Sequence, residues 1–456
     1  MGFQHVGTVV KPPPLKDFQK TGAAWLARRT RAILADDMRL GKTWQVITAA
    51  KRLRAKRVRV ICPAGARLVW VTALRQLAPK ARAFTTTGRV DPNVNGPGWQ
   101  IISYDEARIH RQKLYDQGQF DILVIDESHY LKEPGAQRTK AILGKEGLSW
   151  KAHYIWALSG TPKPNHAGEL WIWARCFGLS RMRWGDWLRR YCVLDQRGNP
   201  RRTKPNRAKE LRDLFSPMVL RRLKSEVAKE LPPTLVERVP VYSSSEFLHL
   251  VDPVGNERTL ARARAEYHQL RENIRRVPVG DRGQWLLQNN QSFATVRRVQ
   301  ALLKAPWVYR TIRDEIRAGA MDRVVVFAYH RDVLEILHTL LREEAQIGAE
   351  LVYGSIAPTR RDAAVKRFSR PRKPTPVFLG QIISAGTAID LSASNHGILI
   401  ERDWVPANNA QALDRMGGFK QTKPVSIREI YTPDSIDDII HEVTEHKSSL
   451  ARAIFD

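Results

Sequence analysis

Cysteine is scarce in this chain of 456 residues, which contains three: Cys62, Cys176 and Cys192. None stands in a Cys-x-x-Cys pair, so the sequence excludes both a disulfide framework and the usual structural zinc site. No stretch approaches the roughly 18 apolar residues that a membrane span requires. The N-terminus has no apolar signal core, and Val6 is unsuited to a myristoylation signal. We therefore expect a cytoplasmic chain with no membrane partner, bacterial or phage-encoded given its compact size, or a nuclear one if it is eukaryotic.

Acidic residues are few relative to basic ones. The chain has 46 Asp and Glu residues against 75 Lys and Arg residues, which gives a formal net charge of +29. An excess of this size favours a polyanionic partner, either nucleic acid or an acidic membrane surface. Basic runs at 51–59 and 181–207 are candidate contacts, although a charge run is more often a solvated face, so no single arginine identifies the binding surface.

Short apolar, β-branched runs alternate with helical patterns along the chain. The clearest runs are residues 57–62, 121–126, 154–158, 323–328, 377–380 and 397–401. A continuous apolar run is typical of a parallel strand buried on both faces, and alternation with helices predicts a doubly wound α/β sheet. The runs form two groups, so we predict an α/β fold with two doubly wound parallel-sheet lobes and helical insertions.

Domain boundaries follow from the gap between the two groups. Pro232 and Pro233 cannot continue a helix, which predicts a linker around them. The Trp-rich stretch at 171–187 has helical spacing, which predicts packing in a core rather than stacking on bases. The predicted parts are a first lobe at 1–180, its basic helical insertion at 181–220, an inter-lobe linker at 221–235, and a second lobe at 236–456 with a helical insertion at about 255–310.

A phosphate-binding loop is predicted at residues 36–43 (DDMRLGKT), directly after an apolar run. A helix N-terminus offers unsatisfied N–H groups and a positive dipole end to phosphate. Leu40 and Gly41 would approach the phosphates through the backbone, Lys42 would reach the β- and γ-phosphates, and the Thr43 hydroxyl would ligate magnesium. A chance Gly-Lys-Thr at a helix start is the alternative, because Asp36 stands where the pattern has its first glycine.

Asp126 and Glu127 follow the apolar run 122–125, where a second nucleotide motif is expected. A carboxylate at a strand end can hold magnesium, and we assign this role to Asp126. Glu127 can accept a proton from the attacking water. Two motifs in the right order and on the right elements make a chance polar turn a poor explanation, so Lys42, Asp126 and Glu127 are the predicted catalytic residues.

The motifs taken together resemble those of the Swi/Snf-type superfamily 2 helicase-like ATPases, which are double-stranded DNA translocases and chromatin remodellers. The matching segments are residues 15–26, 33–43, 126–140, 158–165 and 219–233, with more divergent matches at 384–391 and 411–421. The resemblance implies two RecA-like lobes that hydrolyse ATP with Mg²⁺ in the cleft between them. It implies double-stranded DNA as the partner, branched DNA included, with the protein monomeric on DNA.

The resemblance also assigns roles to further residues. Gln19 would read adenine, and Gln411 and Arg415 would complete the nucleotide site from the second lobe. The segment Ser159, Gly160 and Thr161 would couple hydrolysis to DNA binding. The DNA track would include Pro63, Ala64, Ser103, Ser384, Ala385 and Gly386.

One departure from the family pattern bears on activity. The last motif normally supplies two arginines three positions apart; Arg415 is present, but Gly418 occupies the second position. An arginine finger contributes about 10³–10⁵ in rate in related phosphoryl-transfer enzymes, and Lys420 or Lys423 would replace it only in part. We expect slower or more tightly gated hydrolysis. Two alternatives stay open: a nucleotide-gated DNA-binding clamp with weak or no turnover, and an RNA-dependent ATPase.

Overall fold

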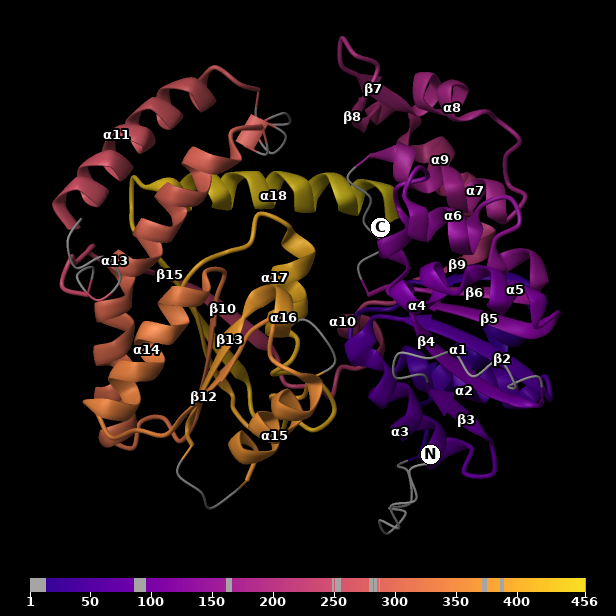
Figure 1. Ribbon diagram of the computed structural model, residues 1–456, viewed down its shortest axis with the longest axis horizontal. Coiled ribbons are helices and arrows are strands. Elements are labelled where there is room, and N and C mark those ends of the chain that lie inside the picture. Colours follow the sequence, from indigo (N-terminus) through magenta and orange to yellow (C-terminus); the bar gives the residue numbers. More distant parts are fainter. Residues whose placement is uncertain are drawn as a thin grey trace. The chain divides into compact units, whose positions relative to one another are not determined.

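The computed structural model describes residues 14–85, 96–160, 166–247, 250, 256–278, 282, 285–286, 288–370, 375–385 and 389–455. The chain divides into two compact units, Met1–Ala228 with Ala451–Asp456, and Lys229–Leu450. The division falls inside the predicted linker. Figure 1 draws the first unit in indigo to magenta and most of the second in orange to yellow.

The first unit is built on a seven-stranded sheet with the order β3-β4-β2-β5-β6-β1-β9, in which neighbouring strands pair in parallel. Its strands are β1 (Arg31–Leu34), β2 (Arg57–Cys62), β3 (Ala83–Thr85), β4 (Gly98–Ser103), β5 (Phe120–Asp126), β6 (Ala152–Leu158) and β9 (Val219–Leu220). The apolar runs are buried because helices cover both faces, as a parallel sheet requires.

Helices connect most successive strands of this sheet. The helices of the first unit are α1 (Asp17–Ala27), α2 (Lys42–Arg52), α3 (Arg67–Leu77), α4 (Tyr104–Ile109), α5 (Arg111–Asp116), α6 (Gln137–Leu143), α7 (Trp171–Cys176), α8 (Trp184–Tyr191), α9 (Ala208–Phe215) and α10 (Lys224–Val227). Short 3₁₀ helices occur at Ala64–Ala66, Ser128–Leu131, Leu148–Lys151, Ala167–Leu170, Pro205–Arg207 and Ser216–Met218.

The basic region after α7 contains an antiparallel pair, β7 (Cys192–Leu194) and β8 (Pro200–Thr203), between α8 and α9. Trp173 and Trp187 are buried in the same core as Ile33 of the central sheet. The prediction that these tryptophans serve a core is therefore confirmed. Side chains from α9 join that core as well, so the region packs onto the first unit.

The second unit has a six-stranded parallel sheet with the order β10-β15-β14-β11-β13-β12. Its strands are β10 (Thr234–Pro240), β11 (Val324–Ala328), β12 (Ala349–Val352), β13 (Val377–Gln381), β14 (His396–Leu399) and β15 (Val425–Tyr431). Its helices are α11 (Asn256–Arg275), α13 (Asn290–Arg317), α14 (Arg331–Glu343), α15 (Pro358–Phe368), α16 (Ile382–Ala385), α17 (Pro406–Leu413) and α18 (Ile436–Phe455).

The predicted α/β fold class is confirmed, since each unit is built on a parallel sheet with helices. In the first unit, the carboxyl ends of β1, β5 and β6 lie together, because Leu34 and Asp126 are both register partners of Leu158. This edge of the sheet is where ligands bind in open α/β folds. Within the residues described above, no helix has the combined length and apolar character needed to cross a membrane.

Candidate active site

The phosphate-binding loop connects β1 to α2 at this sheet edge. Gly41 is the N-cap of α2 and has a φ of +75°, a left-handed conformation that favours glycine. A Cβ atom at Gly41 would lie 2.4 Å from Nε2 of Gln19. Thr43 is the second residue of α2, so the first turn of this helix presents its N–H groups to the loop.

Lys42 is held by the loop itself. Its Nζ donates hydrogen bonds to the backbone oxygens of Asp36, at 2.7 Å, and Asp37, at 3.1 Å. Burial lowers the pKa of Lys42, whereas the negative charges of Glu127 and Asp126 act to raise it. Lys42 therefore has carboxylates nearby, and a phosphate group would compete with the two carbonyls for its ammonium group.

Gln19 contacts the same loop from α1. Its Nε2 donates to the carbonyl oxygen of Leu40 at 3.2 Å, and its Oε1 accepts from the backbone N–H of Lys16 at 3.0 Å. The structure thus brings Gln19, Leu40 and Gly41 together. Through these hydrogen bonds the side-chain amide of Gln19 stabilises the loop. To bind adenine, the amide would have to give up these partners.

Asp126 ends β5 and faces the loop lysine. Its Oδ2 accepts from Nε1 of Trp70 at 2.8 Å, and its Oδ1 accepts from the backbone N–H of Glu127 at 3.0 Å. Burial and the Glu127 carboxylate raise the pKa of Asp126 to about 6. The hydroxyl of Tyr104 donates to the backbone oxygen of Asp126 at 2.6 Å, and this hydrogen bond holds the end of β5 in place.

Glu127 has a φ of +52°, a left-handed conformation that is uncommon and strained for a residue with a side chain. Its Oε2 lies 3.4 Å from Nδ1 of His129. Burial lowers the pKa of His129 to about 4, so this imidazole is neutral at physiological pH and the contact is not an ion pair. The neutral imidazole of His129 is therefore a polar neighbour that does not neutralise the negative charge of Glu127.

Arg222 clamps the loop, and sequence reasoning missed this role. Its Nε and Nη2 donate to the two carboxylate oxygens of Asp36 at 2.9 and 2.5 Å, and Asp36 is 0% exposed. Arg222 also donates to Oε1 of Gln45 at 2.8 Å and to the backbone oxygen of Phe18 at 2.5 Å. One guanidinium thus ties β9 to the end of β1, to α1 and to α2.

The segment at the end of β6 abuts the lysine. Ser159 is buried and its N–H donates to the backbone oxygen of Leu34 at 3.2 Å. A Cβ atom at Gly160 would lie 2.5 Å from Cγ of Met38 and 3.3 Å from Nζ of Lys42, so a side chain at this position would displace Met38. Thr161, the third predicted coupling residue, lies outside the described residues.

The predicted DNA-track residues of the first unit lie at the same sheet edge. Pro63 and Ala64 follow β2, and Ala64 is exposed. Ser103 is buried, and its hydroxyl accepts from the N–H of Glu106 at 3.2 Å as the N-cap of α4. The hydroxyl of Ser103 therefore caps α4, and a contact with DNA would compete with this hydrogen bond.

The remaining candidates lie in the second unit, whereas the lysine loop lies in the first. Gln411 lies on α17 and Arg415 follows it, with its backbone oxygen accepting from the N–H of Leu391 at 2.8 Å. Ser384 and Ala385 close α16. Gly386 lies outside the described residues.

Gly418 has a φ of +101°, so its backbone adopts a conformation that L side chains rarely take. Lys420, a candidate replacement for the missing arginine, pairs with Asp390 at 2.9 Å on an exposed surface. Gln421 fixes the turn by donating from Nε2 to the backbone oxygens of Ser394 and Met416 at 2.9 and 3.1 Å. The turn is thus built around glycine, and an arginine would be strained there.

Comparison with known proteins agrees with this geometry. The SNF2-related domain family matches residues 18–252, which is more than half of the chain. The chain belongs to the SNF2 family of helicase-like ATPases. The helicase conserved C-terminal domain matches residues 307–420 in the second unit. The predicted family is confirmed, and it is a family of ATP-hydrolysing enzymes.

Several relatives of this SNF2 chain are known. It is 25% identical over 464 residues to human "DNA annealing helicase and endonuclease ZRANB3", covering 96% of this chain and 40% of that protein. It is 25% identical over 475 residues to "ISWI chromatin-remodeling complex ATPase CHR11" of Arabidopsis thaliana, covering 96% and 42%. The "Sulfolobus solfataricus SWI2/SNF2 ATPase core in complex with dsDNA" is 24% identical, covers 99% of this chain and 95% of that one, and has a TM-score of 0.46. The chain therefore spans less than half the length of these curated relatives.

Proposed function

We propose that the chain is an ATP-dependent translocase on double-stranded DNA, branched DNA included, that acts as a monomer. The observation that carries this proposal is the assembly of Lys42, Asp126 and Glu127 at one sheet edge, with Gly160 against the lysine. A site that binds phosphate beside a segment expected to couple to DNA supports movement rather than hydrolysis alone. The net charge of +29 supports a polyanionic track.

The oxygen ligands present fit Mg²⁺. Asp126 supplies a partly buried carboxylate at the strand end, and Thr43 supplies a hydroxyl in the first turn of α2. Hard oxygen ligands of this kind, together with phosphate oxygens, are what Mg²⁺ prefers. The ion, when bound, would neutralise charge on the transferring phosphoryl group.

The residues of this chain then have distinct tasks. Lys42 would exchange its bonds to the loop carbonyls for bonds to phosphate, and Gln19 would hold the loop in place. Glu127 would accept the proton of the attacking water at its carboxylate. We propose that Arg415 and Gln411 complete the site from the second unit, and that closing and opening of the units moves the chain along phosphates.

A second candidate is a nucleotide-gated DNA-binding clamp with weak or no turnover. The glycine-specific turn at Gly418 favours it, because the usual second arginine has no unstrained place there. Steady-state phosphate release, measured with and without duplex DNA, separates the two. Stimulation by duplex DNA supports the translocase; nucleotide binding without turnover at saturating DNA supports the clamp, and stimulation by RNA alone would contradict both.

A further inference from the structure

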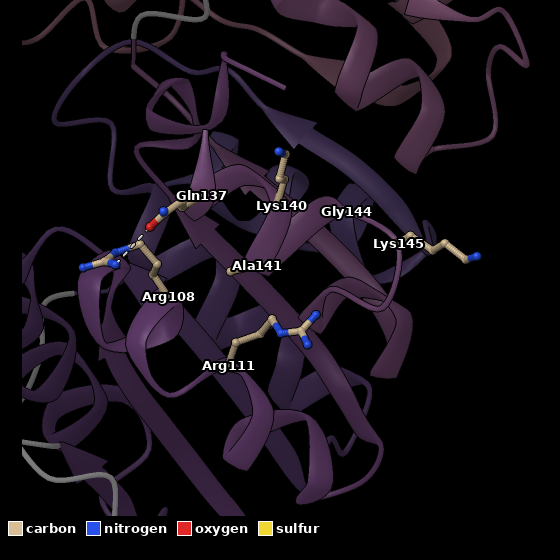
Figure 2. A pocket seen from close by; sticks show the side chains of 7 residues that line it. All are labelled: Arg108, Arg111, Gln137, Lys140, Ala141, Gly144 and Lys145. Carbon is tan, nitrogen blue, oxygen red and sulfur yellow. Dashed lines mark hydrogen bonds between the residues drawn. The ribbon is translucent and has the colours of Figure 1, made fainter. Parts of the chain in front are cut away.

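We propose that a basic groove on the first unit, away from the lysine loop, binds single-stranded nucleic acid. The groove is an open hollow of about 600 Å³ between α4, α5 and α6. Figure 2 shows Ala141 in its middle, with four cationic side chains around it. These side chains are Arg108, Arg111, Lys140 and Lys145.

The groove has no acidic lining residue to balance this charge. Arg108 donates to Oε1 of Gln137 at 3.2 Å, and Arg111 donates to the backbone oxygen of Glu146 at 3.4 Å, so both arginines are positioned by neutral groups. Within the described ranges, none of the four cations forms an ion pair with a carboxylate. Four like charges around one hollow repel each other, and a polyanion would relieve that repulsion.

The floor of the groove suits a backbone ligand. Ala141 and Gly144 are small, so a chain of phosphates would meet little steric hindrance there. Arginine forms paired hydrogen bonds with phosphate oxygens, and lysine supplies a mobile point charge. The groove thus has the chemistry of a phosphodiester site.

Trp150 favours a single strand over a duplex as the ligand of this groove. Its indole is 69% exposed, and its Nε1 donates to the backbone oxygen of Gly144, a groove residue, at 3.0 Å. The ring is therefore tethered to Gly144, while most of the surface of Trp150 is open to solvent. Unpaired bases stack on exposed aromatic rings of this kind, whereas a duplex keeps its bases inside. The combination of cations and one tethered ring fits a single strand.

The experiment uses the full chain without nucleotide and an end-labelled oligothymidylate of about ten nucleotides, within the usual site size. Fluorescence anisotropy at several salt concentrations gives the affinity and its salt slope. Lys140→Gln/Lys145→Gln is expected to lower the affinity and to reduce the slope by about 1.4, because each single-strand phosphate contact contributes about 0.7. The matched control is Lys80→Gln/Lys209→Gln, which removes the same charge from exposed positions elsewhere on the unit and should leave the slope unchanged.

Trp150→Ala is expected to weaken binding about tenfold with an unchanged slope, since stacking releases no counterions, and Trp150→Tyr should restore most of the affinity. A wild-type slope in the Lys140→Gln/Lys145→Gln variant would overturn the proposal. It would also be overturned if Trp150→Ala had no effect while duplex and single-strand affinities fell equally in the lysine variant, because the groove would then be a duplex contact.

This proposal goes beyond ATP-driven movement on duplex DNA, and the two can fail separately. Binding is measured without nucleotide, so it does not depend on turnover. A wild-type chain whose ATPase ignores duplex DNA, but whose groove variants lose oligothymidylate binding, would refute the translocase and retain the groove. DNA-stimulated ATPase with unaltered oligothymidylate binding in the variants would do the reverse.

Discussion

Replacing Arg222 by methionine is expected to loosen the nucleotide loop at its base. The substitution keeps an unbranched stem of similar length but removes the guanidinium from Asp36, whose side chain has no exposed surface. Asp36 would keep the hydrogen bond donated by Nε2 of Gln45 at 2.9 Å. Removing one partner of a buried ion pair costs about 3–5 kcal/mol, because the remaining charge stays buried and uncompensated.

Amide hydrogen exchange measures this cost where it arises. The chain has two units, so a single global unfolding free energy is poorly defined and local opening is the better quantity. In Arg222→Met, protection in β1 and α2 should fall by on the order of a hundredfold or more, while α14 of the second unit serves as the internal reference. Arg189→Met is the matched control, because its ion pair with Asp186 is exposed and contributes roughly 0–1 kcal/mol.

A second variant tests the electrostatic reason. Arg222→Met/Asp36→Asn removes the buried charge together with its partner, so it should recover part of the lost protection. Unchanged protection of β1 in the single variant would refute the reasoning. Equal loss in the single and double variants would show that packing, and not the uncompensated carboxylate, determines the effect.

Other predictions follow from the remaining geometry. Glu127→Gln should abolish phosphate release while nucleotide binding persists, and normal turnover in this variant would place the proton acceptor elsewhere. Burial alone would raise the pKa of Glu401, but the charge and hydrogen bonds of His330 hold that pKa at about 2, below the ordinary 4.5. The second unit should therefore lose about 3 kcal/mol as pH falls from about 4.5 towards 2, and urea midpoints should show this loss in the wild type but not in Glu401→Gln. Gly418→Arg should lower stability by about 1–2 kcal/mol through its left-handed backbone; a faster, equally stable variant would contradict this.

The sequence predicts those strands whose apolar runs are continuous. β5 and β11 are of this kind: their central residues are apolar and buried. The sequence does not predict β15, because polar residues alternate with apolar ones along it. One of these polar residues, Glu429, is nevertheless buried. Arg402 pairs with Glu429 at 2.7 Å from another part of the chain, which makes a buried carboxylate tolerable in that strand. A local pattern contains no information about such a distant partner.

In the candidate site, too, the sequence predicts some residues and gives no signal for others. Lys42 and Asp126 are recognisable because each follows a buried strand within a few residues. The clamp on Asp36 depends on Arg222, which lies 186 positions further along the chain, and on the pairing of β9 with β1. β9 has two residues and gives no periodic signal. The sequence predicts a linker at Arg222 because of Pro232 and Pro233, and no local pattern there indicates a contact with Asp36.

The clamp gives the segment before the unit boundary a direct connection to the nucleotide loop. The N–H of Asp37 donates to the backbone oxygen of Arg222 at 3.0 Å, and the N–H of Lys224 donates to Oδ2 of Asp37 at 2.9 Å. Lys42 donates to the backbone oxygens of Asp36 and Asp37. A phosphate group that withdraws Lys42 must therefore break bonds to the same two residues that hold this segment.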